Sequence, residues 1–156
     1  MQILPNISFC LFAFMLISQG ATTTDKWIGT WKMNTAKSHY QAGTLPKSRT
    51  LSFLAVPGGV KATSDLLDDV GIVHIEFEAK YGGPDVPMRG GNPGPTMAVR
   101  RTDAYAFDSI QKSGGTVIVT THFVVSRDGK VLTATANGLD GAGAKYTNIS
   151  VYDKQP

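Results

Sequence analysis

The chain has 156 residues, a formal net charge of +3, and a composition that is 42% hydrophobic and 17% charged. This excludes intrinsic disorder, which needs fewer apolar residues or a larger net charge, and the length suits one domain with its own core. The basic residues are scattered, and Arg100-Arg101 is their only adjacent pair. We therefore expect no nucleic-acid partner.

Residues 7–17 read ISFCLFAFMLI, a run of 11 residues that is apolar except for one serine. A membrane-spanning helix needs about 20 apolar residues, whereas this length suits the apolar core of a secretory signal peptide. Ser18 and Gly20 place small residues three and one positions before Ala21, as a cleavage site requires. The sequence therefore predicts a signal peptide at residues 1–20 and a secreted or periplasmic protein with no stable membrane insertion after cleavage. A retained anchor and a buried first element are the alternatives.

The mature part, residues 21–156, is expected to form a single domain. The one cysteine, Cys10, lies in the predicted signal peptide. Disulfides, thiolate nucleophiles and cysteine-ligated zinc are therefore excluded from the mature protein.

Apolar and polar residues alternate with a period of two along most of the mature chain, the pattern of half-buried strands. In residues 71–80, for example, Val73, Ile75 and Phe77 share one face, and His74 and Glu76 share the other. Strands are predicted near residues 27–33, 49–56, 60–66, 71–80, 96–101, 104–111, 116–125, 130–137 and 145–153. Residues 35–40 leave room for a single helical turn.

Turn signals such as Pro57-Gly58-Gly59 and Asp128-Gly129 separate these strands by only a few residues. Such short connections fit antiparallel hairpins, because parallel pairing needs a crossover of a dozen or more residues. A long open meander would leave exposed edges, so closure is favoured. The predicted fold is all-β, an antiparallel up-and-down barrel of about 8–10 strands.

Residues 81–95 break the alternation, since they hold five glycines and four prolines. Proline cannot donate to a central ladder. We expect an irregular loop at a barrel mouth, with room for a short edge strand around residues 86–89. Loops of this length are either functional or merely mobile, and both readings stay open.

Three segments resemble the calycin superfamily of lipocalins and fatty-acid-binding proteins. They are WIGTWKMN at residues 27–34, SRDGK at 126–130 and SVYDK at 150–154. Together they are most similar to short secreted bacterial lipocalin-like proteins. The resemblance implies a lipocalin-like barrel that binds a small, mostly apolar molecule in its interior.

Two departures from that pattern bear on the ligand and the lid. Many fatty-acid-binding proteins carry Arg-x-Tyr on the last strand, where this chain has Ser150-Val151-Tyr152. A neutral serine cannot form a bidentate ion pair with a carboxylate. The dozen residues 35–47 are also too few for the helical lid of that family, so a lidless barrel is expected.

Candidate ligand contacts are the aromatic and polar side chains that alternation can turn inward. We expect Trp31 instead to be structural, plugging one end of the barrel, with Gly29 allowing close approach and, as the resemblance implies, Lys154 or Lys145 packing over the indole. Small alanines at positions 62, 134 and 136 could leave a gap, so a cavity and a solid core both remain open. The candidate contacts are Phe53, Phe77, Tyr105, Phe107, Phe123, Tyr146, Ser150 and Tyr152.

Nothing in the sequence predicts catalysis, a metal or a cofactor. No nucleophile elbow, His-Glu-x-x-His, P-loop or dinucleotide fingerprint is present. His74 shares its face with Glu76 and Glu78, which most simply faces water, and His122 is either an outer-face residue or a titratable group in a pocket. We expect a binding protein and no enzyme. The alternative is a secreted interaction or inhibitor module that has no small-molecule ligand and uses residues 81–95 as its contact.

Overall fold

A computed structural model describes residues 24–91 and 94–156, and the predicted signal peptide lies outside the described residues. The described chain forms ten strands and one 3-10 turn, η1 (Thr35–Lys37). The strands are β1 (Gly29–Met33), β2 (Ser48–Val56), β3 (Gly59–Leu67), β4 (Ile72–Lys80), β5 (Val86–Pro87), β6 (Thr96–Arg101), β7 (Ala106–Ser113), β8 (Thr116–Val125), β9 (Val131–Leu139) and β10 (Lys145–Lys154).

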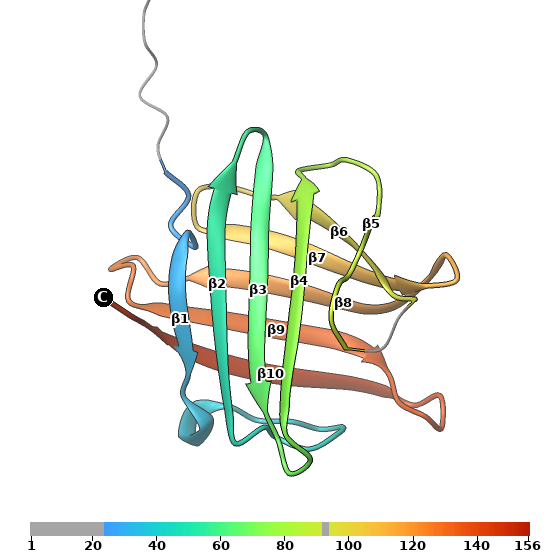
Figure 1. Ribbon diagram of the computed structural model, residues 1–156. Helices are drawn as coiled ribbons and strands as arrows, with labels where there is room; N and C mark the ends of the chain where they lie inside the picture. Colours follow the sequence, from blue (N-terminus) through green and yellow to red (C-terminus); the bar gives the residue numbers. More distant parts are fainter. Residues whose placement is uncertain (1–23, 92–93) are drawn as a thin grey trace, which may run out of the picture.

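All ten strands belong to one antiparallel sheet in the order β4-β3-β2-β1-β10-β9-β8-β7-β6-β5. Each strand pairs with the strand that follows it in the chain, except that β4 does not pair with β5, and these two strands form the ends of the sheet. In addition, the first strand, β1, pairs with the last, β10. In Figure 1, β1–β4 form a front layer whose strands cross those of the layer behind, β6–β10. The predicted all-β, up-and-down barrel is therefore confirmed, as a nearly closed one.

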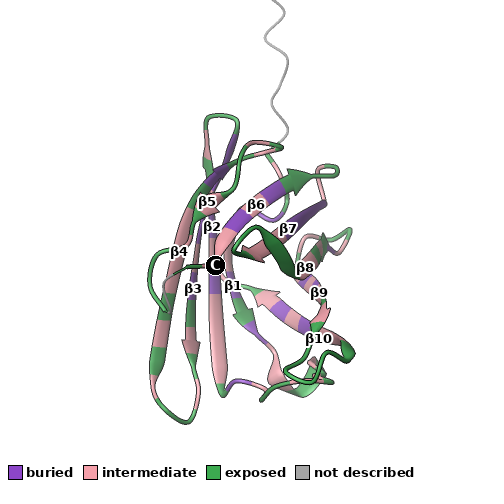
Figure 2. Ribbon diagram, turned by 90° about the vertical axis from the view of Figure 1, so that its right-hand side faces the viewer, coloured by how far each residue is buried: buried purple, intermediate pink, exposed green. Residues whose placement is uncertain are grey.

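Alternation sets which side chains point inward. On β9, Leu132 and Ala134 are buried while Thr133 and Thr135 between them are partly exposed. The tight connections are those that the turn signals predicted, such as Pro57-Gly58 between β2 and β3. Figure 2 shows exposed hairpin tips and buried residues recurring along strands such as β6.

One part of β8 departs from the predicted alternation. The β7–β8 register shifts between Gln111 and Lys112, which pair with Val119 and Val117. A bulge of this kind adds a residue to one strand and breaks the period of two. Val117 was expected on the inward apolar face and is instead 52% exposed.

Residues 81–91 lie in the barrel wall between β4 and β6, whereas the sequence suggested a loop at a mouth. The short strand β5 pairs with β6, and the backbones of Glu76 on β4 and Arg89 exchange hydrogen bonds of 2.9 and 2.8 Å. Gly90 passes so close to β4 that an added Cβ would lie 2.0 Å from the His74 carbonyl oxygen. The segment thus closes most of the seam between the two ends of the sheet (Figure 1).

A packed cluster around the two tryptophans fills one end of the barrel. Trp27 and Trp31 are both 0% exposed, and the Trp31 Nε1–H donates a 2.7 Å hydrogen bond to the Trp27 carbonyl. The Lys154 ammonium lies 4.9 Å from the centre of the Trp31 ring. Gly29 has a φ of +131°, and a Cβ there would lie 3.2 Å from Lys154 Cε. Of the two lysines considered, Lys154 is therefore the one placed over the indole.

The connection between β1 and β2 forms a strap rather than a helical lid. It holds the single turn η1 and then runs along β10, where His39 and Ile149 form an isolated bridge. The Asn148 side chain fixes the strap by accepting hydrogen bonds from the backbone N–H groups of Gln41 and Ala42, at 2.8 and 3.1 Å. This places the neighbouring residue, Tyr40, at the barrel interior.

Candidate functional site

The barrel encloses an interior cavity of about 310 Å³. Its lining comes from strands of both layers and from Tyr40 on the strap. This volume lies at the lower end of the range of small-molecule sites, which is roughly 300–1,000 Å³. Between the two alternatives left open by the sequence, the structure has a cavity rather than a solid core.

Pairing of large with small side chains produces the space. Ala62 on β3 lies directly between Phe53 on β2 and Phe77 on β4, and Ala134 on β9 is paired with Phe123 on β8. The methyl group of an alanine reaches less far into the barrel than the neighbouring phenylalanine ring, and it therefore leaves space beside the ring unfilled. All five residues line the cavity.

Phenylalanines form an aromatic wall at one side of this space. Phe107 and Phe123 are stacked, with ring centres 4.5 Å apart and planes 5° from parallel. Phe53 meets both rings edge-on, at 5.3 and 5.9 Å. Such contacts hold the rings in fixed positions, so the apolar part of the cavity is preformed.

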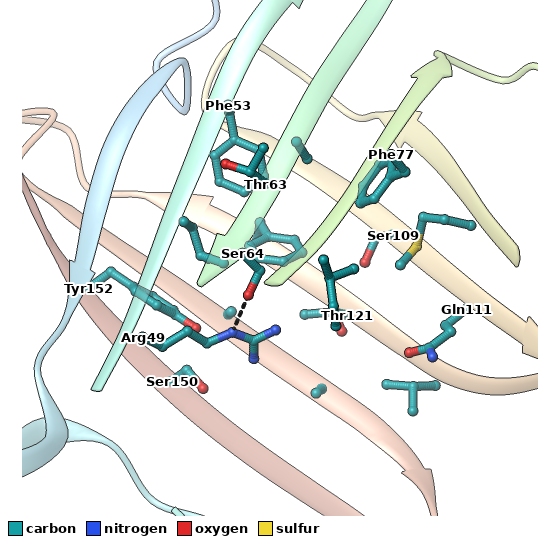
Figure 3. Close-up of a pocket in the computed structure, with 18 of the residues that line it drawn as sticks. Arg49, Phe53, Thr63, Ser64, Phe77, Ser109, Gln111, Thr121, Ser150 and Tyr152 are labelled. Carbon is teal, nitrogen blue, oxygen red and sulfur yellow. Dashed lines mark hydrogen bonds between the residues drawn. The ribbon is translucent and has the colours of Figure 1, made fainter. Parts of the chain in front are cut away.

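Arg49 on β2 is the one charged side chain among the described residues that line the cavity, and no aspartate or glutamate joins it there. Its Nε–H donates a 2.9 Å hydrogen bond to the Ser64 hydroxyl on β3, a residue only 8% exposed. Figure 3 shows this bond and the guanidinium reaching toward the middle of the cavity. The bond uses Nε and leaves the two terminal NH₂ groups to face the interior.

Hydroxyl groups surround Arg49. The Tyr40 and Ser150 hydroxyls are 3.0 Å apart, and Tyr152 follows Ser150 on the inward face of β10 (Figure 3). Burial raises the pKa of the Tyr152 phenol above its ordinary value of 10.0, although the nearby Arg49 charge acts to lower it. Tyr152 is therefore a neutral O–H donor at physiological pH. Together these groups make an end of the cavity suited to a negatively charged oxygen.

A second polar group lies on β7 and β8, apart from Arg49 (Figure 3). Ser109 and Thr121 are cross-strand partners, and Gln111 follows Ser109 on the same face of β7. Ser109 is 7% exposed. This uncharged patch adjoins the Phe107–Phe123 pair on the same two strands.

Six of the eight candidate contacts line the cavity: Phe53, Phe77, Phe107, Phe123, Ser150 and Tyr152. Tyr105 does not, because it precedes β7 in a turn, where its backbone N–H bonds to the Asp103 carboxylate and its ring lies 5.2 Å from the Arg127 guanidinium. Tyr146 lines a separate surface hollow, since its ring leans over Gly138, the residue paired with it.

Two histidines lie on outer faces, each beside an aspartate. His74 is 2.6 Å from Asp65, and His122 is 2.6 Å from Asp108, which also accepts from Arg100 at 2.6 Å. Burial acts to raise the pKa of Asp108, but hydrogen bonds from Arg100 and His122 outweigh it, and the net pKa lies below its ordinary 3.8. Of the two alternatives for His122, the structure therefore has the outer-face position and not the one inside a pocket.

Within residues 24–91 and 94–156 no group of three or more His, Cys, Asp or Glu side chains could hold a metal ion. The same ranges contain no helix long and apolar enough to cross a membrane.

Several residues that line the cavity were not predicted from the sequence, although their positions in the alternating pattern place them on the inward face. Arg49 has the same parity as Leu51 and Phe53, which points it inward. Ser109 and Thr121 likewise follow the parity of the phenylalanines beside them. Tyr40 carried no such signal, because its position depends on the strap rather than on a strand.

No protein-family model and no curated protein matches the sequence. Among solved structures, a Schistosoma mansoni fatty acid binding protein in complex with arachidonic acid is similar, with a TM-score of 0.56 and 14% sequence identity. The match covers 86% of this chain and 99% of that chain. At this identity the likeness establishes the fold alone, and it agrees with the antiparallel barrel that the sequence predicted.

Proposed function

We propose that this barrel binds one small, mostly apolar molecule with an acidic end in its interior. The observation that carries the proposal is the placement of Arg49, a guanidinium that faces the cavity with no carboxylate among the described lining residues. A buried or partly buried cation without an anion is costly. An organic acid would supply the missing charge.

The two sides of the cavity suit the two parts of such a ligand. The phenylalanine wall would bury the hydrocarbon part, which is the main source of affinity in sites of this kind. Arg49 would bind the carboxylate through its terminal NH₂ groups, and the neutral Tyr152 hydroxyl could donate a further hydrogen bond. Arg49 thereby offers, from β2, the positive charge that the last strand lacks at Ser150.

The similar solved structure supports this proposal, because it is of a binding protein that holds arachidonic acid. The alternative of an interaction module gains no support from the described residues 81–91 of its expected contact segment, because they form part of the wall. We further propose that the protein acts outside the cytoplasm, which the apolar run at residues 7–17 supports. N-terminal sequencing of the exported protein would test that location by showing whether the chain begins at Ala21.

A fluorescence titration with the neutral apolar dye N-phenylnaphthylamine, followed by displacement with dodecanoate, tests interior binding. The cavity-filling variant Ala134→Leu should take up much less dye than the wild type. Its matched control is Thr135→Leu, the next residue on β9, which points outward and should leave uptake unchanged. Equal uptake by all three proteins would refute interior binding, and no displacement by dodecanoate would refute the binding of an organic acid at that site.

A further inference from the structure

The patch of Ser109, Gln111 and Thr121 lies at a fixed place in the cavity lining. On β7 and β8 the inward rungs run from the pair Phe107 and Phe123, through Ser109 and Thr121, to Gln111 opposite Val119. Successive inward rungs on a strand are about 7 Å apart. A ligand lying against the phenylalanine pair therefore also lies against the polar patch.

The patch differs in chemistry from the Arg49 end. Serine and threonine hydroxyls and a glutamine amide can each donate and accept hydrogen bonds, and none of them carries a charge. Their partner would be a neutral group such as a hydroxyl or a carbonyl, rather than a second carboxylate.

The polar side chains at the two ends of the cavity also differ in whether they already form hydrogen bonds with other side chains of the protein. At the Arg49 end, Ser64 accepts from Arg49 and Ser150 is paired with Tyr40. No side-chain hydrogen bond joins Ser109, Gln111 or Thr121 to another side chain in the described part of the chain. Ser109 is nevertheless only 7% exposed and lines the cavity. A plain hydrocarbon tail would cover these groups without replacing their hydrogen bonds to water, which is unfavourable.

We infer that the ligand is an oxygenated organic acid, with a hydroxyl or carbonyl group on its hydrocarbon part that bonds to the cross-strand pair Ser109 and Thr121. This inference rests on the proposed function, because it places the acidic end at Arg49. It narrows the ligand class from mostly apolar acids in general to acids with a second, neutral polar group. A site built to hydrogen-bond such a group discriminates against an analogue that lacks it.

Calorimetric titration of the wild-type protein with dodecanoate and with the set of its positional hydroxy-isomers tests the inference. At least one hydroxydodecanoate should bind about five- to tenfold more tightly than dodecanoate, as one neutral hydrogen bond provides. The isomer that binds best would report the distance between the two polar ends of the cavity.

Two nearly isosteric variants locate the effect. Ser109→Ala and Thr121→Val should each reduce the ratio of the affinity for that isomer to the affinity for dodecanoate. Thr120→Val, one residue along β8 and on the outer face, should retain the full preference. Thermal melting of each variant shows that it is folded.

The outcomes separate the two proposals. If dodecanoate binds and every hydroxy-isomer binds no more tightly, the patch serves ordered water only and the inference is wrong, while the proposed function stands. A preference that survives in both patch variants also overturns the inference. If no acid of the set binds, the proposed function fails and the inference fails with it.

Discussion

The Arg49 guanidinium and the Ser64 hydroxyl are joined by a 2.9 Å hydrogen bond between β2 and β3 inside the barrel. Because this bond uses Nε, the planar guanidinium has a set orientation, and its terminal NH₂ groups face the cavity. The hydroxyls around it come from β10 and from the strap. Neighbouring strands and one loop thus build a positively charged end in an interior that is otherwise uncharged.

Replacing Arg49 should reduce the affinity for acids selectively. Arg49→Gln is expected to weaken dodecanoate binding by about 1.5–3 kcal/mol, the contribution of a hydrogen bond to a charged group. Arg49→Lys should restore only part of it, because an ammonium cannot make the bidentate contact. Binding of dodecanol, which has no charge, is the control and should change little. An equal loss for dodecanol and dodecanoate would mean that Arg49 acts only through packing.

Truncating the buried indole of Trp31 should destabilise the closed end of the barrel. Trp31→Ala is expected to lower the free energy of unfolding by about 3–5 kcal/mol, the range for large aromatic truncations, because this side chain is 0% exposed. Urea denaturation measures the effect. Leu54→Ala, at a position 58% exposed, is the control and should change stability little. An unchanged unfolding midpoint for Trp31→Ala would refute a structural role.

Substitutions at Gly29 and Lys154 distinguish backbone strain from steric contact as the reason for a glycine at position 29. Gly29→Ala should cost about 1–3 kcal/mol, because a φ of +131° is strained for any residue with a Cβ. The nearby atom, Lys154 Cε, belongs to the flexible end of a side chain and can move. The cost should therefore persist in a Lys154→Ala background, with a coupling below about 0.5 kcal/mol. If the cost disappears there, contact with Lys154 was its cause.

Asp108 should make stability fall in acid. A carboxyl whose pKa is lower in the folded than in the unfolded state stabilises the fold above its unfolded value, and that contribution is lost as the pH falls through the folded pKa. For Asp108 the loss therefore begins as the pH approaches the ordinary value of 3.8 and continues below it. Unfolding midpoints in urea, measured from neutral to strongly acidic pH, should decline less steeply for Asp108→Asn than for the wild type.

The control for this pH dependence is Asp69→Asn, which removes an exposed ion pair with Lys47. Exposed pairs contribute little to stability, so this variant should follow the wild-type curve. Parallel curves for Asp108→Asn and the wild type would contradict the assigned role of Asp108.

Alternation and turn chemistry were sufficient to predict the strands and the antiparallel barrel. They failed where a local feature overrides the period of two, as at the β7–β8 bulge that exposes Val117. The position of residues 81–91 could not be predicted, because their pairing with β4 and β6 depends on the curvature of the whole sheet. In the structure, backbone hydrogen bonds between Glu76 and Arg89 and the close approach of Gly90 to β4 hold this segment in the seam.

The site was predictable in its apolar part and less so in its polar part. The alternation of inward and outward residues along each strand predicts which phenylalanines point inward, and all four that were proposed line the cavity. Arg49 has the same parity, but a charged residue on a half-buried strand is usually assigned to solvent. Tyr105 and Tyr146 do not line this cavity, because Tyr105 lies in a turn and Tyr146 leans over a glycine.

The central claim, an acid held inside the barrel by Arg49, is tested most directly by NMR of dodecanoate labelled with ¹³C at its carboxyl group. We predict a distinct signal for the bound acid that stays ionised at a lower pH than the free acid, because a neighbouring guanidinium favours the carboxylate form. In Arg49→Gln this shift should disappear. The absence of a bound signal, or a bound carboxyl that titrates at the same pH in both proteins, would contradict the claim.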